Sequence, residues 1–516
     1  MFDSPKISLA SLLGKEYARA LADAAASTGA ASKRKAERLV NKKVSLYSRQ
    51  RQYSDIKLLE KVGSSVIPQF VAHQGAATDA FAKALHREMS PLSARGMTRV
   101  GEDGRLYYIG KSEHYHASLG HSFPGYELLN VARQLGVPNA THNNTRGYIT
   151  RTLERELVRA ANGGVDDEEL GKILISRERK VLNRVVNLET GSLAVEAAVK
   201  MMLARFYRLD SNFDAPVHEG KTPVFLTMED YGGGKGANYH GTTVLTQTMR
   251  GLWPGFLAKA EVAGLYKVVT VKINDIADFK QKIEQYCTGG YYVAGFMHEI
   301  ILMNYGAVEL QDAYLKEAYA LCEKHKVPTL VDEIQSCMWY PGMFCFRQKK
   351  LSPDFVVIGK GFPGGEYPAS RLITTAEYDN LNLFGALVTN GQEELASLSY
   401  LITMEFAKAN EKKIKKNGEY FQNELKKLVA ASNGVIKEAC GSGYLAGLRF
   451  ADVDDAARYA KYLNGICIDI SAQLYKADCP PVVLLKPPLT AGKEATDFLV
   501  GKLNEALQKY KITENE

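Results

Sequence analysis

Two short apolar runs rich in β-branched residues constrain the fold of this chain more than any other feature. One is Thr-Leu-Val-Asp-Glu-Ile-Gln at residues 329–335, and the other is Val-Val-Ile-Gly-Lys-Gly-Phe-Pro-Gly-Gly at residues 356–365. Each run is bounded by proline or glycine, and charged residues follow its apolar part. Runs of this kind are typical of strands buried in a parallel sheet. We therefore expect an α/β fold whose mostly parallel central sheet is flanked by helices.

The carboxyl ends of the two predicted strands carry polar and charged side chains. The first presents Asp332, Glu333 and Gln335, and the second presents Lys360 on a glycine-rich turn. Open α/β sheets bind their ligands at this edge, and glycines let backbone and ligand approach closely. In the alternative interpretation the carboxylates cap a loop and Lys360 is a solvated turn residue. Both motifs occur in this order on two predicted strands, which favours a shared site.

The composition of the 516 residues narrows the class of protein. Hydrophobic residues make up 46% and charged residues 24%, as in ordinary globular proteins. The formal charge of +7 is mild for this length, so we expect no nucleic-acid partner. The seven cysteines show no CxxC spacing, which indicates neither a disulfide framework nor a zinc site. No run approaches the ~18 apolar residues of a membrane span. We expect a cytoplasmic protein without a metal.

The polar ends of these runs also resemble a known pattern. Asp-Glu-Ile-Gln at 332–335, then Pro-Asp at 353–354 and Gly-Lys-Gly at 359–361, is similar to the core of the class III aminotransferases. These enzymes use pyridoxal 5'-phosphate (PLP) and include ornithine, acetylornithine, 4-aminobutyrate and lysine 6-aminotransferases. The resemblance implies that Lys360 forms the Schiff base with PLP. It also implies that Asp332 faces the pyridine nitrogen and that Gln335 faces the ring hydroxyl.

A lysine and an aspartate can perform this chemistry whether or not the resemblance holds. A lysine with a lowered pKa can attack the cofactor aldehyde and later move a proton between the substrate carbon and the cofactor. A carboxylate beside the ring nitrogen keeps that nitrogen protonated, so that the ring can take up an electron pair. Lys360 and Asp332 are therefore the expected catalytic residues.

A glycine and a serine open a strongly predicted helix at Gly191 and Ser192. The start of a helix offers backbone N–H groups and the positive end of the helix dipole to a phosphate. A serine in this position can also act only as an N-cap. The resemblance implies that these two residues bind the cofactor phosphate. The family has an acidic residue directly after this serine, whereas this chain has Leu193.

Further cofactor contacts are implied by the resemblance alone. The sequence Tyr239-His240-Gly-Thr matches an aromatic-His-Gly-x-Thr element whose aromatic ring stacks on the cofactor. Glu299 matches a glutamate at the end of a sheet strand near the cofactor. Thr389 lies next to the place where family members reach across a dimer interface to the partner's phosphate. The nearby sequence Tyr-Gly-Gly-Gly-Lys-Gly at 231–236 fails the nucleotide-loop pattern, because no Ser or Thr follows the lysine.

The expected substrate side departs from the family. A hairpin at 97–110 is followed by Glu113, His114, Tyr115 and His116, which we expect to line the substrate pocket by resemblance. This histidine-rich segment could in principle bind a metal, but no fixed ligand spacing indicates one. The arginine that clamps the substrate carboxylate in the family is Leu484 here, and Lys486 is the nearest cation.

The acidic gate of several family members is also missing here, where Asn304 occupies that stretch. We therefore expect a preference for amino donors without a carboxylate at this end. Lys486 or the histidines could instead supply a replacement cation.

Taken together, the sequence predicts a fold-type I PLP enzyme. We expect a helical extension at 1–90, a segment at 91–150 that contributes to the small domain and the pocket, a large domain at 151–385 and a small α+β domain at 386–516. The resemblance implies a homodimer. The expected reaction moves an amino group between an amine or amino acid and a keto acid.

Other functions stay open at this point. Epimerisation, aminomutase chemistry or decarboxylation would use the same lysine and electron sink. A non-catalytic binding protein could keep the fold, and a nucleotide-binding switch is disfavoured by the failed loop pattern. The basic residues at 33–43 could bind an anionic partner, although a charge run on a helix is more often a solvated face.

Overall fold

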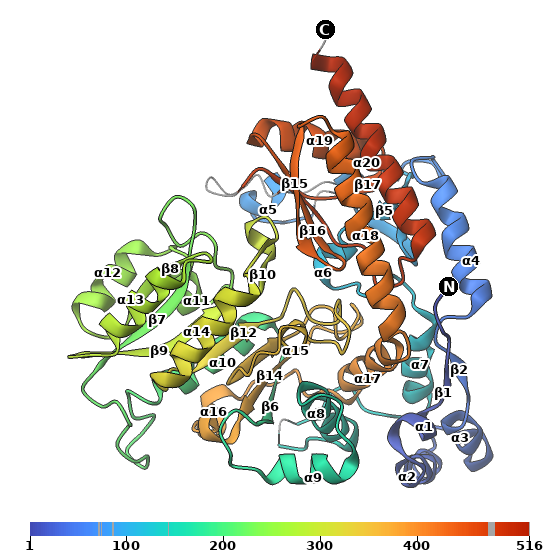
Figure 1. Ribbon diagram of the computed structural model, residues 1–516. Coiled ribbons are helices and arrows are strands. Elements are labelled where there is room, and N and C mark those ends of the chain that lie inside the picture. Colours follow the sequence, from blue (N-terminus) through green and yellow to red (C-terminus); the bar gives the residue numbers. More distant parts are fainter. Residues whose placement is uncertain (71–72, 74, 85–86, 143, 473–479, 515–516) are drawn as a thin grey trace.

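A seven-stranded sheet forms the centre of the protein (Figure 1). The computed structural model describes the main chain of residues 1–70, 73, 75–84, 87–142, 144–472 and 480–514. In spatial order the strands are β6 (Leu182–Leu188), β14 (Ser370–Thr375), β13 (Phe355–Ile358), β12 (Thr329–Asp332), β9 (Tyr291–His298), β7 (Thr222–Glu229) and β8 (Lys267–Lys272). Only β14 pairs antiparallel with its neighbours, and the other pairs are parallel. The predicted mostly parallel sheet is confirmed.

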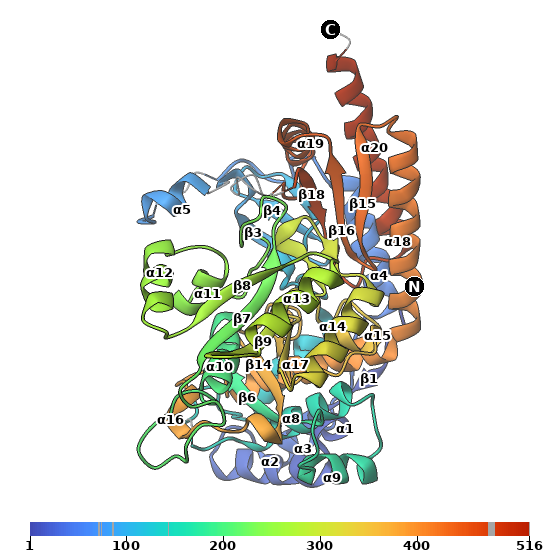
Figure 2. The ribbon, with the colours of Figure 1, turned by 60° about the vertical axis from the view of Figure 1, so that its left-hand side comes forward.

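Both faces of the sheet are buried, which explains why its strands read as continuous apolar runs. In β13, Phe355 and Val357 enter one apolar cluster, whereas Val356 and Ile358 enter another. The first cluster includes α10 (Gly191–Leu203), α11 (Val244–Met249) and α12 (Pro254–Val262). The second includes α8 (Tyr148–Ala161), α13 (Ile276–Tyr286), α14 (Asp312–Lys324) and α17 (Glu394–Ala409). Figure 2 shows these helices around the sheet.

The C-terminal part adds a smaller layered unit. A three-stranded antiparallel sheet combines β15 (Ile436–Ser442), β16 (Leu445–Phe450) and β18 (Val482–Leu485). It packs with α18 (Glu411–Ala431), α19 (Val453–Gly465) and the C-terminal α20 (Lys493–Glu514), which stand together at the top of Figure 1.

Residues from both halves of the chain share a second small sheet. Its strands, in order, are β17 (Ile468–Asp469), β5 (Leu106–Ile109), β4 (Thr98–Gly101) and β3 (Pro91–Arg95). The turn that follows β5, α6 (Ser112–Tyr115), leads directly to the pocket described below. The remaining short elements are α7 (Glu127–Gln134), α9 (Asp167–Ile175), α15 (Cys345–Gln348), α16 (Leu383–Ala386), β10 (Ile301–Leu302) and β11 (Val308–Glu309).

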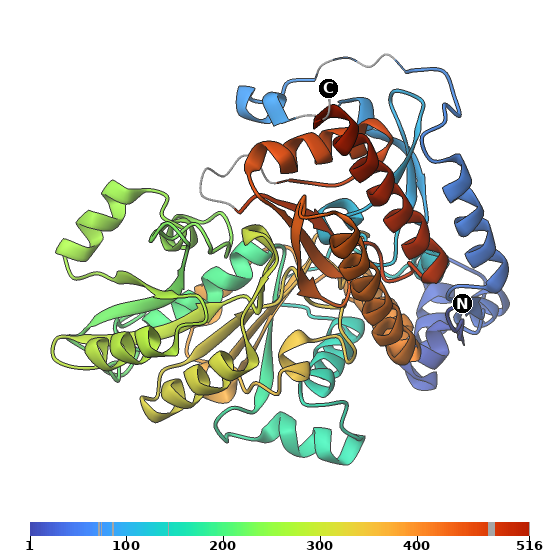
Figure 3. The same cartoon turned by 45° about the horizontal axis from the view of Figure 1, so that its top comes forward.

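The N-terminal extension is mostly helical and docks on the same body (Figure 3). It contains α1 (Leu9–Leu13), α2 (Lys15–Ser27), α3 (Lys33–Val40), α4 (Arg49–Leu58) and α5 (Asp79–Ala84), and a two-stranded ladder of β1 (Lys6–Ile7) and β2 (Val44–Ser45). Its apolar residues belong to the main core, where the rings of Phe2 and Phe406 lie 5.7 Å apart.

The basic residues of α3 are exposed, whereas Ala36, Leu39 and Val40 are buried. This helical spacing gives α3 one apolar face and one solvated face. Among the described residues, no helix has the length and apolar character needed to cross a membrane.

Candidate active site

A cavity of about 460 Å³ lies at the carboxyl edge of the central sheet. Its walls come from five places: the turn after β5, the turn between β6 and α10, the segment after β7, the end of β12, and the chain that follows β13. The lining residues from these places include Thr190, Gly191, Ser192, Tyr239, His240, Gly241, Asp332, Gln335 and Lys360. Residues that the sequence places far apart therefore meet where parallel strands end, as the switch-point rule expects.

Lys360 lies on the turn after β13 with a φ of 34°, a backbone conformation unusual for a residue with a side chain. Burial of its ammonium group lowers its pKa to about 8, although the carboxylates of Glu299 and Asp332 oppose this shift. Its Nζ atom lies 5.2 Å from the centroid of the Tyr115 ring. Its amine therefore loses its proton far more readily near neutral pH than that of an ordinary lysine, as a nucleophilic lysine requires.

Asp332 ends β12 and is 3% exposed. Its Oδ1 atom accepts a hydrogen bond of 3.1 Å from the Ile334 N–H, and its Oδ2 atom lies 3.0 Å from Nδ1 of His240. The carboxylate is thus held by two fixed partners while it still lines the pocket. Its remaining lone pairs are available to a cationic N–H of a ligand.

Two buried polar atoms on residues that line the pocket have no hydrogen-bond partner in the described part of the chain. They are Nε2 of His240 and Oε1 of Gln335. The Nε2 atom of Gln335 donates to Oε2 of Glu299 at 2.9 Å, which fixes the amide. Glu299 follows β9 and stands behind Gln335 rather than in the pocket wall. Buried polar atoms are normally paired, so these two indicate a polar ligand in the cavity.

The start of α10 is built for an anion. Thr190 occupies the N-cap and makes no side-chain cap hydrogen bond within the described chain. A Cβ atom on Gly191 would lie 2.0 Å from Cδ1 of Ile334, so any larger residue here requires the Ile334 side chain to move. The hydroxyl of Ser192 accepts a hydrogen bond of 3.1 Å from the Thr242 N–H and so links this turn to the segment after β7.

These features fit PLP, the cofactor that the sequence resemblance implies. The cavity offers an amine in Lys360, a carboxylate in Asp332, unpaired polar atoms between them and an uncapped helix start for a phosphate. Within the described residues, no cluster of three or more metal-ligating side chains could hold a metal ion.

Arg371 lies on the face of the central sheet opposite α10 and was not singled out from the sequence. It is fully buried on β14 and donates to the carbonyl oxygens of Ser370 at 2.8 Å and of Leu188 at 3.4 Å, and to the hydroxyl of Ser397 at 3.3 Å. Its guanidinium also lies 5.0 Å from the Tyr400 ring centroid. Arg371 therefore ties β14 to β6 and α17, and it is not among the residues that line the pocket.

The two other expected cofactor contacts differ in position. Tyr239 lines the pocket, and the guanidinium of Arg250 lies 5.1 Å from its ring centroid. Thr389 is exposed and lies outside the pocket lining of this single chain.

The expected substrate residues divide into two groups. His114 and His116 line the pocket, whereas Glu113 and Tyr115 support the turn from behind. Glu113 pairs with Arg99 and with Nε2 of His121, and these contacts hold its pKa at about 2 despite partial burial. Desolvation within the pocket and the charge of Lys360 lower the pKa of His114, although its side chain is partly open to solvent. Desolvation also lowers the pKa of His116, whose side chain is likewise partly open to solvent. Both rings are therefore neutral near pH 7.

Lys486 is fully buried and is not among the residues that line the pocket. Its Nζ atom donates to the carbonyl oxygen of Gln335 and lies 3.7 Å from the Trp339 ring centroid and 4.4 Å from that of Tyr115. Burial lowers its pKa well below the usual lysine value. This amine thus joins the segment after β12 to the turn after β5.

The sequence reasoning missed one wall of the pocket. Pro363, Gly365, Glu366 and Tyr367 lie shortly after Lys360 in the sequence and line the same cavity. The Gly-Phe-Pro-Gly-Gly run could have indicated this wall, because a chain that turns back at the end of a strand passes over the site there.

Known proteins provide an independent comparison. A family model described as "Aminotransferase class-III" matches residues 91–507. An ornithine aminotransferase from Halalkalibacterium halodurans is 27% identical over 339 residues, which are 63% of this chain and 75% of that protein.

Solved structures have the same fold at lower identity. The ornithine aminotransferase from Toxoplasma gondii gives a TM-score of 0.65 at 18% identity and covers 86% of this chain and 94% of its own. An adenosylmethionine-8-amino-7-oxononanoate aminotransferase from Methanocaldococcus jannaschii also gives 0.65, at 20% identity, with 89% and 99% covered. The latter two likenesses concern the fold alone.

Proposed function

Because this chain belongs to the class III aminotransferases, and is therefore a PLP-dependent enzyme that transfers amino groups, we propose that Lys360 carries the cofactor and that Asp332 activates it. One observation carries this proposal: Lys360, whose pKa is lowered to about 8, shares a cavity with the Asp332 carboxylate, which is fixed by two partners. The enzyme moves an amino group between an amino compound and a keto acid.

The bound cofactor supplies an electron sink for the pair left when a bond at the substrate carbon breaks. Lys360 acts at two points: its neutral amine attaches the cofactor, and once released it carries a proton to or from the substrate carbon. Asp332 keeps a proton on the ring nitrogen through its negative charge. His240 donates to Asp332 and keeps the carboxylate oriented toward the cavity.

The other cofactor contacts are proposed from their positions around these two residues. Gly191 and Ser192 present the helix start to the phosphate, and Tyr239 and His240 cover one side of the ring. Gln335, braced by Glu299, faces the ring hydroxyl with its unpaired Oε1 atom. Thr389 is proposed to reach the phosphate of a second subunit, which is consistent with its exposure.

We propose a homodimer as the working assembly. Trp253 and Phe256, near the start of α12, are 55% and 49% exposed, and Leu383 and Phe384 on α16 are 58% and 82% exposed. Helix α11 lies next to α12, and both α11 and α16 pack on α10. The first turn of α10 lines the pocket. A second copy that covers these side chains would lie beside the site. Light scattering should give a dimer mass for the wild type and a monomer for Trp253→Ser combined with Phe256→Ser.

For the substrate, we propose an amino donor without a carboxylate at the end near His114 and His116. Both imidazoles are neutral near pH 7, and Lys486 is occupied by Gln335 and two aromatic rings. Glu113 and Tyr115 contribute by shaping the turn that carries the histidines. Among the described lining residues, Lys360 is the only lysine or arginine.

We also propose a cytoplasmic location and the domain limits 1–90, 91–150, 151–385 and 386–516. Subcellular fractionation tests the first. Limited proteolysis tests the second, because cleavage should concentrate near these limits.

A spectral screen of the purified protein tests the proposed function. Amines, amino acids and keto acids are added one at a time, and absorbance follows the interconversion of the aldehyde and amine forms of the cofactor. We expect an amine donor to convert the aldehyde form and a keto acid to restore it. Turnover of a substrate by epimerisation or decarboxylation, without this interconversion, would replace aminotransfer with another PLP reaction.

A further inference from the structure

The turn that carries His114 has an unusual backbone. Ser112, Glu113, His114 and Tyr115 have φ angles of 49°, 51°, 56° and 75°, so four consecutive residues with side chains are left-handed. L-residues rarely adopt this conformation even singly. Such a segment persists only where the surrounding structure holds it in place.

One side of the turn is held by Lys486, which directly follows β18 of the C-terminal unit. The hydroxyl of Ser112 donates to the carbonyl oxygen of Lys486 at 2.6 Å, and the Lys486 N–H donates to the carbonyl of Gly110 at 2.8 Å. The ring of Tyr115 packs against the amine of Lys486. These contacts fix the two ends of the turn.

The other side is held through Glu113. Its carboxylate contacts Arg99 and lies 2.9 Å from Nε2 of His121. The backbone of His121 exchanges two hydrogen bonds of 2.8 Å with Gly96, in the turn between β3 and β4. The His121 carbonyl also accepts from Nη2 of Arg51 at 3.4 Å. These contacts therefore connect the turn at 112–115 to helix α4.

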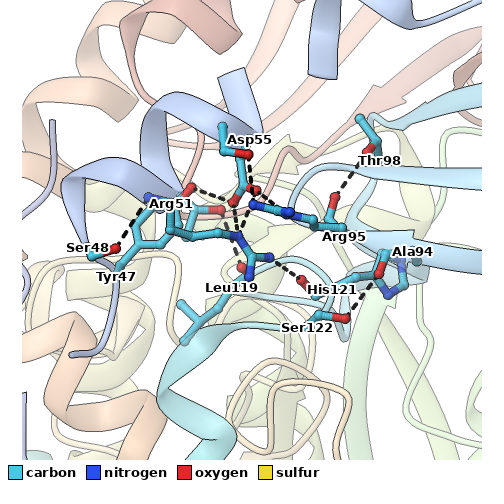
Figure 4. A network of polar contacts seen from close by, with 12 residues as sticks. Tyr47, Ser48, Arg51, Asp55, Ala94, Arg95, Thr98, Leu119, His121 and Ser122 are labelled. Carbon is cyan, nitrogen blue, oxygen red and sulfur yellow. Dashed lines mark hydrogen bonds and ion pairs between the residues drawn. The ribbon is translucent and has the colours of Figure 1, made fainter. Parts of the chain in front are cut away.

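Asp55 on α4 holds this set of contacts together (Figure 4). Its carboxylate is 1% exposed and lies 2.7 Å from Nε of Arg51 and 3.1 Å from Nε of Arg95, and it accepts from the hydroxyl of Tyr47 at 3.2 Å. A Cβ atom on Gly96 would lie 2.8 Å from Cγ of Asp55, so the carboxylate packs directly on the β3–β4 turn. Two guanidinium groups compensate the buried charge.

We propose that Asp55, acting with Arg51, is a positioning residue for the substrate-side turn. Helix α4 lies outside residues 91–507, which match the family model, so this chain adds the support through its N-terminal extension. The chain of contacts runs from Asp55 through Arg51 to His121, and from there through Glu113 to the turn that directs His114 into the pocket. The expected effect on catalysis rests on the proposed function. The expected effect on the backbone of the turn at 112–115 does not.

Asp55→Asn tests this role in the complete holoenzyme, because it removes the charge with little change in shape. Amides of the turn are protected by local hydrogen bonds, Tyr115 N–H to Lys111 and Ala117 N–H to Ser112. We expect hydrogen exchange of residues 112–117 to rise by about tenfold or more, in line with a local opening. The KM for the amino donor should rise by a similar factor, while cofactor affinity, measured by absorbance titration, should change less than about twofold.

Two further variants keep the test decisive. Arg51→Met removes the link to the His121 carbonyl but keeps the Arg95 contact to Asp55, and it should reproduce the effect if Asp55→Asn fails to fold. Lys42→Met removes the 2.9 Å contact of Lys42 with Glu127, which also ties the extension to the body but not to the turn, and it should leave exchange at 112–117 unchanged.

Unchanged exchange at 112–117 in folded Asp55→Asn and Arg51→Met proteins would overturn the proposal. An equal rise in exchange throughout the protein would also overturn it, because it indicates a general loss of stability. If no amino donor is turned over, the proposed function fails, while the exchange measurement still decides the positioning role.

Discussion

Replacing Lys360 by methionine removes an ammonium group that the fold holds in an unfavourable environment. Methionine keeps most of the length and apolar surface of the lysine side chain, so the packing around the turn after β13 changes little. In the protein without its cofactor, we therefore expect Lys360→Met to raise the free energy of unfolding at neutral pH, while it abolishes cofactor attachment.

The magnitude follows from the pKa of Lys360, which falls from 10.5 to about 8 on folding. One pKa unit corresponds to about 1.4 kcal/mol, so the stabilisation by Lys360→Met is at most about 3 kcal/mol. Below pH 8 the lysine is protonated in both states, and the full penalty is present. Between pH 8 and 10.5 the unfolded state binds more protons, so the penalty shrinks, and above pH 10.5 it vanishes.

Urea unfolding followed by tryptophan fluorescence provides the assay, with both cofactor-free proteins measured at a series of pH values from 7 to 10.5. The difference in the free energy of unfolding should be largest at pH 7 and should decline through this range. Lys415→Met, at an exposed position of α18, is the control and should show no such decline. A Lys360→Met protein that is less stable than the wild type at pH 7, or a difference that does not change with pH, would refute the reasoning.

Two further predictions concern the cofactor and the substrate. Asp332→Asn should keep the fold and much of the cofactor affinity but lower turnover by several orders of magnitude; near-normal turnover would mean that another group serves the ring nitrogen. In half-reaction assays a diamine or ω-amine should react faster than the corresponding α-amino acid, and Lys486→Ala should not reverse this order; an α-amino acid preference that disappears in Lys486→Ala would instead make Lys486 the carboxylate-binding group.

Local sequence was sufficient to predict that Asp332 and Lys360 share one pocket. The two apolar runs became β12 and β13, and Asp332 and Lys360 meet at their ends because parallel strands terminate at one edge of a sheet. Gly191 and Ser192 open a helix as expected and line the same pocket, while their contact with a phosphate stays a prediction.

The substrate end depends on contacts that no local pattern encodes. The left-handed turn at Ser112–Tyr115 contains no glycine, so the usual signal for this conformation is absent. Lys486 is buried because Tyr115 and Trp339 meet around it from distant parts of the chain. Likewise, the residues of α4 appear as an ordinary polar helix, and only the tertiary structure brings Asp55 against Gly96.

Borohydride reduction followed by peptide mapping tests the central claim most directly. The reagent fixes the cofactor to the amine that carries it, and digestion with mass spectrometry then identifies the labelled peptide. We expect one labelled lysine per chain, at Lys360, and no label in Lys360→Met. Label on Lys486 or on any other lysine, or undiminished labelling of Lys360→Met, would contradict the assignment of this pocket as the catalytic site.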